Sequence, residues 1–170
     1  KKMHLMVEKA VVLGQECGPE GRTPSDKATA AISNWPRPTT VKLARGFAAL
    51  AGQFRIWIEH FATIVAPIYA LTKKNARYVW TDECQRAFDE LKVKLCSKPV
   101  LRPLNYDAGY VESHEIVVSS DAGPLGGGGW LGQRVGSGKA RAPARYFSMV
   151  YNEAQRNYSQ LKKEALVTVK

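Results

Sequence analysis

The chain has few cysteines and few histidines, and both shortages exclude classes of protein. Three cysteines in 170 residues, without a C-x-x-C pair, cannot form a disulfide framework, so we expect a reducing compartment. The three histidines stand far apart and offer no zinc-binding spacing. The longest apolar run, residues 61–71, contains Pro67 and is too short to cross a bilayer. We therefore expect no membrane partner.

Acidic residues are also scarce. The chain has 15 of them against 25 lysines and arginines, which gives a net charge of +10. Each half of the chain carries +5 of this excess, so the charge is not confined to a tail. A uniformly basic body favours a polyanionic partner, and we prefer nucleic acid over the alternative that the charge only keeps the chain soluble. A hydrophobic share of 45% is typical of a chain with an ordinary folded core.

The first half of the chain predicts a strand pair followed by helices. Turn-forming residues place a hairpin within residues 1–24. Ser25 is expected to cap a helix over residues 26–34, and Thr39 or Thr40 a second helix, which Gly52 breaks. The helical spacing predicts two apolar faces here: Leu43, Phe47 and Leu50, then Phe54, Trp57, Ile58 and Phe61.

A further helix is predicted after a basic turn. Thr81 is its expected cap, and Pro99 is its expected stop. Its buried face should carry Cys84, Phe88, Leu91 and Leu95.

The second half of the chain changes to strand patterns. The first strand should end at Asp121, and Asn152 should open a final helix. The order of helices, then three strands, then a helix predicts an α+β fold in two parts. The expected strands cover residues 116–120, 130–135 and 145–149, and a hairpin turn covers 136–138. In the last helix, one face is expected to carry Tyr158, Leu161, Ala165 and Thr168.

A glycine-rich stretch at residues 123–129 invites two cofactor interpretations. Gly127, Gly129 and Gly132 spell G-x-G-x-x-G, but strands follow where a dinucleotide site needs a helix. The Gly-Lys pair at 138–139 is followed by alanine, which breaks the phosphate-loop pattern. We prefer glycines at places where two strands approach closely.

Asp121 and Glu164 are the acids with chemical potential in this half. Asp121 stands at a strand end, where it either caps a turn or serves as a metal ligand. Glu164 lies one helical turn from Leu161 and from Thr168, beside the expected core, where an unpaired glutamate is unusual. A strand-end aspartate with a helix glutamate is half of a two-metal nuclease site. The other interpretation is a turn cap and a surface glutamate.

Several segments repeat, in order, the pattern of one family. The strongest are W-P-x-P-x-T at 35–40, A-P-I-x-x-L-T-K-K at 66–74, W-T-x-E-C-Q-x-A-F at 80–88 and R-N-Y-S-x-x-x-K-E at 156–164. Together with Val12-Leu13-Gly14 and Ser120-Asp121-Ala122, they resemble the reverse transcriptase and RNase H region of gypsy-class LTR retrotransposon polyproteins.

The resemblance implies four parts. Residues 1–24 would be the end of the polymerase palm with its primer-grip hairpin, 25–71 a helical thumb, 72–112 the connection, and 113–170 a truncated RNase H-like domain. The last part would hold a mixed sheet with a packed helix. The Tyr-x-Asp-Asp polymerase motif of this family does not occur in the chain.

The resemblance also implies the site. Asp121 and Glu164 would be the first and second of four RNase H acids, catalytic residues that hold two Mg²⁺ ions, with the other two acids beyond Lys170. The phosphates of an RNA–DNA hybrid or template–primer duplex would be contacted by five basic residues. These are Lys42, Arg45, Arg55, Lys73 and Lys74.

The implied function is that of a piece of a reverse transcriptase with RNase H, which grips the template–primer and is inactive alone. Its partners would be the nucleic acid and the rest of the polyprotein: palm and fingers upstream, the remainder of RNase H and integrase downstream. The implied location is intracellular, in a cytoplasmic virus-like particle or the nucleus. Two alternatives stay open: a non-catalytic nucleic-acid-binding or scaffold remnant of a degenerate element, and an ordinary basic interaction domain.

Overall fold

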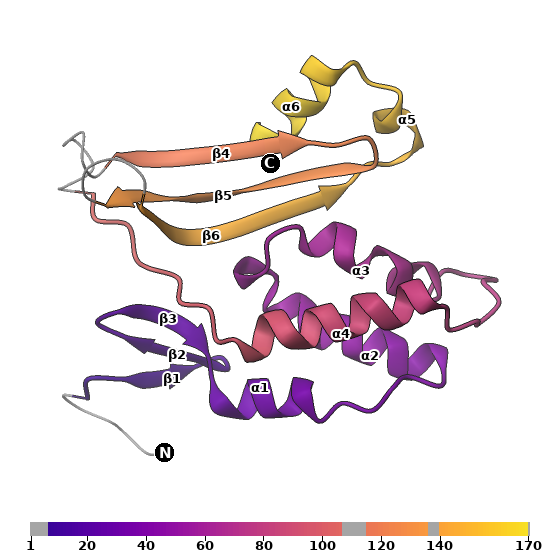
Figure 1. The fold of residues 1–170 in the computed structure, drawn as a ribbon, viewed down its shortest axis with the longest axis horizontal. Coiled ribbons are helices and arrows are strands. Elements are labelled where there is room, and N and C mark those ends of the chain that lie inside the picture. The colour runs from indigo at the N-terminus through magenta and orange to yellow at the C-terminus, as the bar shows by residue number, and fades with distance from the viewer. Residues whose placement is uncertain (1–6, 107–114, 136–139, 170) are drawn as a thin grey trace.

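The structure, a computed structural model, describes residues 7–106, 115–135 and 140–169, and it confirms the α+β fold class. Two three-stranded antiparallel sheets flank a group of helices (Figure 1). The larger sheet is the middle layer, with one short helix group above it and the main helical unit below it. The predicted hairpin turn at 136–138 lies outside the described residues.

The first sheet has three strands where the sequence predicted two. They are β1 (Ala10–Val12), β2 (Gln15–Gly18) and β3 (Gly21–Pro24), paired in that order. Leu13 and Gly14 both have positive φ angles, 51° and 80°, and form the tight turn that connects β1 to β2. The extra strand was missed because it consists of only three residues.

The helical unit contains α1 (Asp26–Ser33), α2 (Val41–Gln53), the 3₁₀ helix η1 (Arg55–Trp57), α3 (Phe61–Ala70) and α4 (Asp82–Cys96). The predicted caps are confirmed. The side-chain oxygens of Ser25, Thr40 and Thr81 each accept a hydrogen bond from a backbone N–H three residues later. These bonds satisfy N–H groups that a helix start leaves free.

Three predictions in this unit differ from the structure. Gly52 does not break α2, which continues to Gln53. The buried face of α2 is shifted from the predicted one, because Leu43 is 37% exposed while small side chains pack inside. The third predicted helical stripe is not one helix, because His60 with its left-handed φ of 58° separates η1 from α3. All four residues of this stripe are nevertheless buried, as predicted. The buried residues of α2 are Ala44, Phe47, Ala48 and Ala51.

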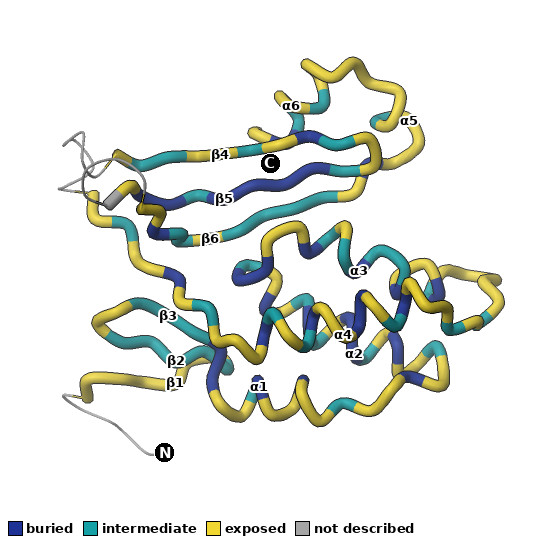
Figure 2. Tube along the Cα trace, viewed as in Figure 1, coloured by how far each residue is buried: buried dark blue, intermediate teal, exposed yellow. Residues whose placement is uncertain are grey.

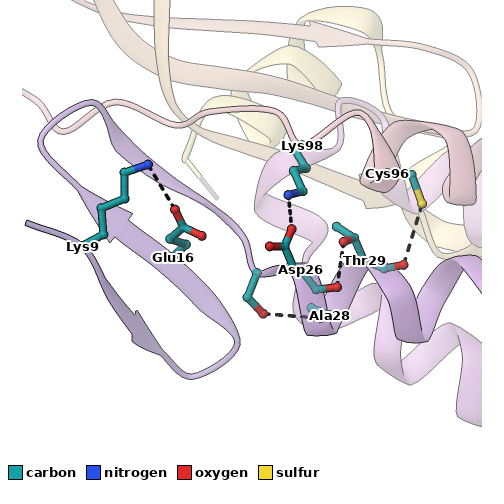
Figure 3. Close-up of polar contacts among 8 residues, drawn as sticks. Lys9, Glu16, Asp26, Ala28, Thr29, Cys96 and Lys98 are labelled. Atoms are coloured by element: carbon teal, nitrogen blue, oxygen red, sulfur yellow. Dashed lines mark hydrogen bonds and ion pairs between the residues drawn. The ribbon is translucent and has the colours of Figure 1, made fainter.

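One hydrophobic core joins α1 through α4 (Figure 2). The rings of Phe47 and Phe88 lie 4.5 Å apart at its centre. The predicted face of α4 is confirmed, since Cys84, Phe88, Leu91 and Leu95 are all at most 3% exposed. Polar contacts at the edge of the core, drawn in Figure 3, include an ion pair between Asp26 of α1 and Lys98 and the bond from the Cys96 thiol to the Thr29 carbonyl oxygen.

The second sheet consists of β4 (Ile116–Ala122), β5 (Gly126–Val135) and β6 (Ala140–Val150). Its described strands pair only in an antiparallel way, so the mixed sheet that the resemblance implied is not present among them. Four glycines that precede the predicted strand 130–135 belong to β5, where Asp121 pairs with Gly128. Strands can include such residues where another segment packs too closely for a side chain.

The C-terminal part forms two helices, α5 (Glu153–Arg156) and α6 (Gln160–Val169), in place of one. Asn152 opens the first with a capping box to Gln155. Leu161 was predicted to face the sheet and is instead 76% exposed, whereas Val167 is 1% exposed. The break after α5 rotates α6, so the predicted face does not apply.

Backbone contacts tie the two sheets together along the segment that follows α4. Arg22 and Leu101 exchange two backbone hydrogen bonds of 2.9 Å, and the Arg102 N–H donates to Pro143 O at 2.9 Å. The Gln133 side chain adds two bonds to the backbone of Asn105, at 2.8 and 2.7 Å. No described helix has the length and apolar character needed to span a membrane.

Candidate metal and nucleic-acid site

Helix α6 lies along β4, and two side-chain contacts fix its position there. The hydroxyls of Ser120 and Thr168 are 2.8 Å apart. At the other end of α6, the side-chain amide of Gln160 donates to Ala122 O at 2.8 Å and to the Glu164 carboxylate at 3.1 Å. The helix residue Glu164 is therefore held beside the strand segment that contains Asp121.

The pKa of a buried tyrosine, Tyr151, is affected by both acids. Tyr151 is 2% exposed, and burial raises the pKa of its hydroxyl above the usual value. The negative charges of Asp121 and then Glu164 raise this pKa further. Tyr151 packs with Ala122 of β4 and Val167 of α6, so it lies between the two elements that carry these acids. This hydroxyl has no hydrogen-bond partner among the described residues.

Gly127 of β5 allows α6 to pack closely against the sheet. A Cβ added there would meet Val167 Cγ2, and would lie 2.7 Å from Asp121 O and 3.0 Å from the Tyr151 hydroxyl. Any side chain at this position would push α6 away from β5. The glycine stretch thus has a packing role, as the sequence interpretation preferred.

The two acids can supply only part of a metal site. Asp121 and Glu164 are both exposed, and no group of three or more potential ligand residues occurs in the described part of the chain. Ser120 and Ala122, the neighbours of Asp121 in β4, both contact α6. Because side chains alternate between the two faces of a strand, Asp121 would point to the other face. Its negative charge nevertheless raises the pKa of Tyr151. Whether the pair shares an ion stays a prediction.

The predicted phosphate-contacting residues fall into two places. All five are exposed. Arg45 donates to Thr72 O at 3.3 Å, which places α2 beside the turn that carries Lys73 and Lys74. Lys42 precedes Arg45 by three residues on the same helix, and so shares this surface. Arg55 lies apart, in η1, where it lines a cavity of about 240 Å³ against β6.

Three residues of the site or its support were missed in the sequence. Tyr151 and Gln160 gave no motif, although Gln160 stands one turn before Glu164, a spacing at which helix side chains meet. Lys92 donates to Ser33 O at 2.8 Å and to Trp35 O at 2.6 Å, and lies 4.4 Å from the Phe88 ring centre. Lys92 therefore joins α1 to α4 and is not free for phosphate.

The comparison with protein families matches residues 80–170 to the RNase H-like domain found in reverse transcriptase. The chain belongs to this family. The described part of this RNase H-like region comprises α4, the second sheet and the helices beyond it. RNase H-like domains generally use divalent metal ions.

Relatives of this RNase H-like chain are Pol polyproteins. It is 30% identical over 164 residues to the Retrovirus-related Pol polyprotein from transposon 412 of Drosophila melanogaster, covering 96% of the chain and 13% of that protein. It is 41% identical over 103 residues to the Gag-Pol polyprotein of Woolly monkey sarcoma virus, covering 59% of the chain and 6% of the relative. The predicted kinship with retrotransposon Pol proteins is confirmed, and the gypsy class stays a prediction.

Solved structures show the same fold. The foamy viral protease-reverse transcriptase in complex with RNA/DNA hybrid superposes with a TM-score of 0.76 at 24% identity, over 95% of this chain and 21% of that one. The dRH form in complex with double-stranded DNA gives 0.77 at 23% identity, over 97% and 28%. The RNase H-like chain thus spans only a small share of the length of these relatives. Its helices and sheets are arranged as in the matching region of the solved structures.

Proposed function

We propose that this chain is the part of a reverse transcriptase with RNase H that grips an RNA–DNA hybrid and supplies two of the RNase H acids. The observation that carries the proposal is the position of α6 on β4, which holds Glu164 beside the strand segment that contains Asp121. A family match alone would not place an aspartate and a glutamate from separate elements at the same end of a sheet. The division into palm end, thumb, connection and RNase H-like part belongs to this proposal.

Asp121 and Glu164 would hold Mg²⁺ through their carboxylate oxygens, the ligands that this ion prefers. When bound, the metal would activate water and stabilise charge on the cleaved phosphate. The chain's own contribution is positioning. Gln160 holds the Glu164 carboxylate and is itself anchored to Ala122 O, so the glutamate oxygen has a fixed direction. The two acids are insufficient alone, and the isolated chain should cleave negligibly.

Hybrid binding would use the surface formed by Lys42, Arg45, Lys73 and Lys74, defined here as the thumb surface. Each of these side chains is exposed, and none forms an ion pair among the described residues. Basic side chains without an acidic partner can contact the phosphates of an A-like duplex and make no contact with its base edges. Two solved relatives named above are complexes with nucleic acid, which supports the same partner class here.

The test is a binding titration with a labelled RNA–DNA hybrid at several salt concentrations. We expect a steep fall of log K with log salt, and a smaller slope in Lys73→Gln/Lys74→Gln, since each lost phosphate contact reduces the slope by about 0.9 for a duplex. Arg86→Gln/Lys27→Gln removes the same charge elsewhere and serves as the control. A flat salt dependence, or equal slopes in both variants, would contradict the proposed grip.

A further inference from the structure

A second basic surface lies away from the thumb surface, and we define it as the arginine groove. It has a volume of about 460 Å³, within the range of roughly 300–1,000 Å³ seen for ligand sites. Its walls come from the small sheet (β2 and β3), the segment 101–106 and the larger sheet (β5 and β6), three regions distant in sequence. In Figure 1 this segment leaves α4 at the end opposite the turn that carries Lys73 and Lys74. A ligand here would not compete directly with the thumb surface.

Three arginines line the groove: Arg22, Arg102 and Arg145. No acidic residue lines it, and none of the three forms an ion pair within the described parts of the chain. The Arg22 guanidinium donates to Ala144 O at 3.2 Å, which fixes one of its nitrogens and leaves the others for a ligand. Three uncompensated guanidinium groups around one concave surface favour an anion with several oxygens, such as phosphate.

The backbone that carries these arginines is held in place. Arg22 is tied to Leu101 by two backbone bonds, and Arg102 is tied to β6 through Pro143 O. The close approach requires Gly21, with φ 128°, because a Cβ there would meet Leu101 O. Since the groove is built on paired strands, the backbone that carries its arginines is already ordered, and less order has to be imposed when a ligand binds.

An aromatic side chain also lines the groove. Tyr106 lines it and is 69% exposed, and Leu104 is a neighbouring apolar residue in the wall. An exposed ring beside unpaired arginines fits an unpaired nucleic acid strand, because bases stack on aromatic rings while arginines hold the phosphates. An acidic peptide would use the charges and leave the ring without a partner. A duplex would keep its bases inside and could not stack.

We propose that the arginine groove binds single-stranded nucleic acid, with phosphate oxygens between Arg102 and Arg145 and a base on Tyr106. The inference rests on the proposed function only in taking nucleic acid as the partner, and it does not require that the thumb surface binds a hybrid. The groove would hold a strand that is not paired in the hybrid, such as a template overhang. Its location away from the thumb surface allows both to bind at once.

The experiment compares two probes on the full chain: a labelled thymidine oligonucleotide of about 12 nucleotides, and a blunt RNA–DNA hybrid. Arg102→Gln/Arg145→Gln should weaken binding of the single strand about tenfold and reduce its salt slope by ~1.4, at about 0.7 per phosphate contact. Tyr106→Ala should weaken it at least about fivefold, whereas Tyr106→Phe should restore it, because stacking needs the ring and not the hydroxyl. Arg86→Gln/Lys27→Gln is the charge-matched control.

The two proposals can fail separately. If the arginine pair and the control bind the oligonucleotide equally, the groove is not its site and the inference is overturned. Equal loss of both probes in the arginine pair also overturns it, because the groove would then be part of the duplex surface. Single-strand binding that survives Tyr106→Ala unchanged, with polyglutamate competing equally well, would show a general anion site. If wild type fails to bind the hybrid but binds the oligonucleotide through these residues, the inference stands and the proposed grip fails.

Discussion

Ser148 of β6 caps helix α3, because its hydroxyl oxygen accepts a hydrogen bond of 2.8 Å from the Ala62 N–H. Helix α3 begins at Phe61 after the left-handed His60, whose side chain provides no cap. The first turn of this helix therefore finds its partner on a strand that is distant in sequence. This bond joins the helical unit to the larger sheet in addition to their packing.

Replacing Ser148 with alanine should lower the free energy of unfolding by about 1 kcal/mol, the usual cost of losing a helix cap. Urea denaturation measures this change. Thr63→Ala is the matched control, because Thr63 is exposed on the same helix and its replacement should change stability by less than about 0.5 kcal/mol. Equal stabilities of Ser148→Ala and wild type would show that the cap is not formed in solution.

Gly127→Ala should destabilise the chain by about 1–3 kcal/mol, because the new methyl group meets Val167 and the backbone of Asp121. The same change moves α6 and Glu164 away from the strand. Gly52→Ala, inside α2, has only ordinary contacts of 3.7 and 3.9 Å and should stabilise by up to about 1 kcal/mol. Thermal unfolding of both variants decides the matter, and similar shifts in the two would argue against tight packing at Gly127.

The ion pair between Asp26 and Lys98 should make a small, pH-dependent contribution to stability. The hydrogen bond and charge of Lys98 lower the pKa of Asp26, and Asp26 raises the pKa of Lys98. A lowered carboxyl pKa gives stability that is complete above the unfolded value of 3.8 and is lost as the pH falls through the lower folded value. A raised lysine pKa gives stability that is complete below 10.5 and is lost as the pH rises through the higher folded value.

The melting temperature of wild type and Asp26→Asn, measured from pH 2 to pH 8, tests this pair. We expect the two to differ near pH 7 and to converge at the acidic end, where Asp26 in the wild type is protonated. A difference between them that is independent of pH over this range would show that the effect of the substitution is not the loss of the ion pair.

The isolated chain should not extend a DNA primer. Nucleotide addition needs converging carboxylates for two metal ions, and the chain contains no adjacent pair of aspartates. A primer-extension assay with labelled nucleotides checks this, with a complete reverse transcriptase as the positive control. Extension by the purified chain above background would refute the assignment of its first part to a duplex-positioning role.

Local signals in the sequence predicted the starts of α1, α2, α4 and α5 and one buried face well. Ser25, Thr40 and Thr81 act within three residues, so the sequence contains both partners of each cap bond. The face of α4 was found because its apolar residues are large and regularly spaced. The face of α2 was predicted only in part, with Phe47 but without Ala44 and Ala48, because small residues carry little periodic signal.

The candidate site was also predicted only in part, because local signals do not contain its long-range contacts. Asp121 and Glu164 stand in recognisable segments, but the contacts that hold them cross long distances in the sequence. Gln160 reaches Ala122, 38 residues away, and Tyr151 lies between strand and helix. The orientation of α6 depended on the break between α5 and α6, which no residue pattern indicated. The arginine groove joins three separate segments, so no single motif could predict it.

The most direct test of the central claim is a Mg²⁺ titration followed by NMR of the backbone amides around Asp121 and Glu164. If the two acids form one half-site, their signals should shift along a single weak binding curve, and Asp121→Asn should abolish the shift at Glu164. Glu153→Gln, on exposed α5, should leave both unchanged. Independent curves for the two residues, or a Glu164 shift that persists in Asp121→Asn, would contradict the account.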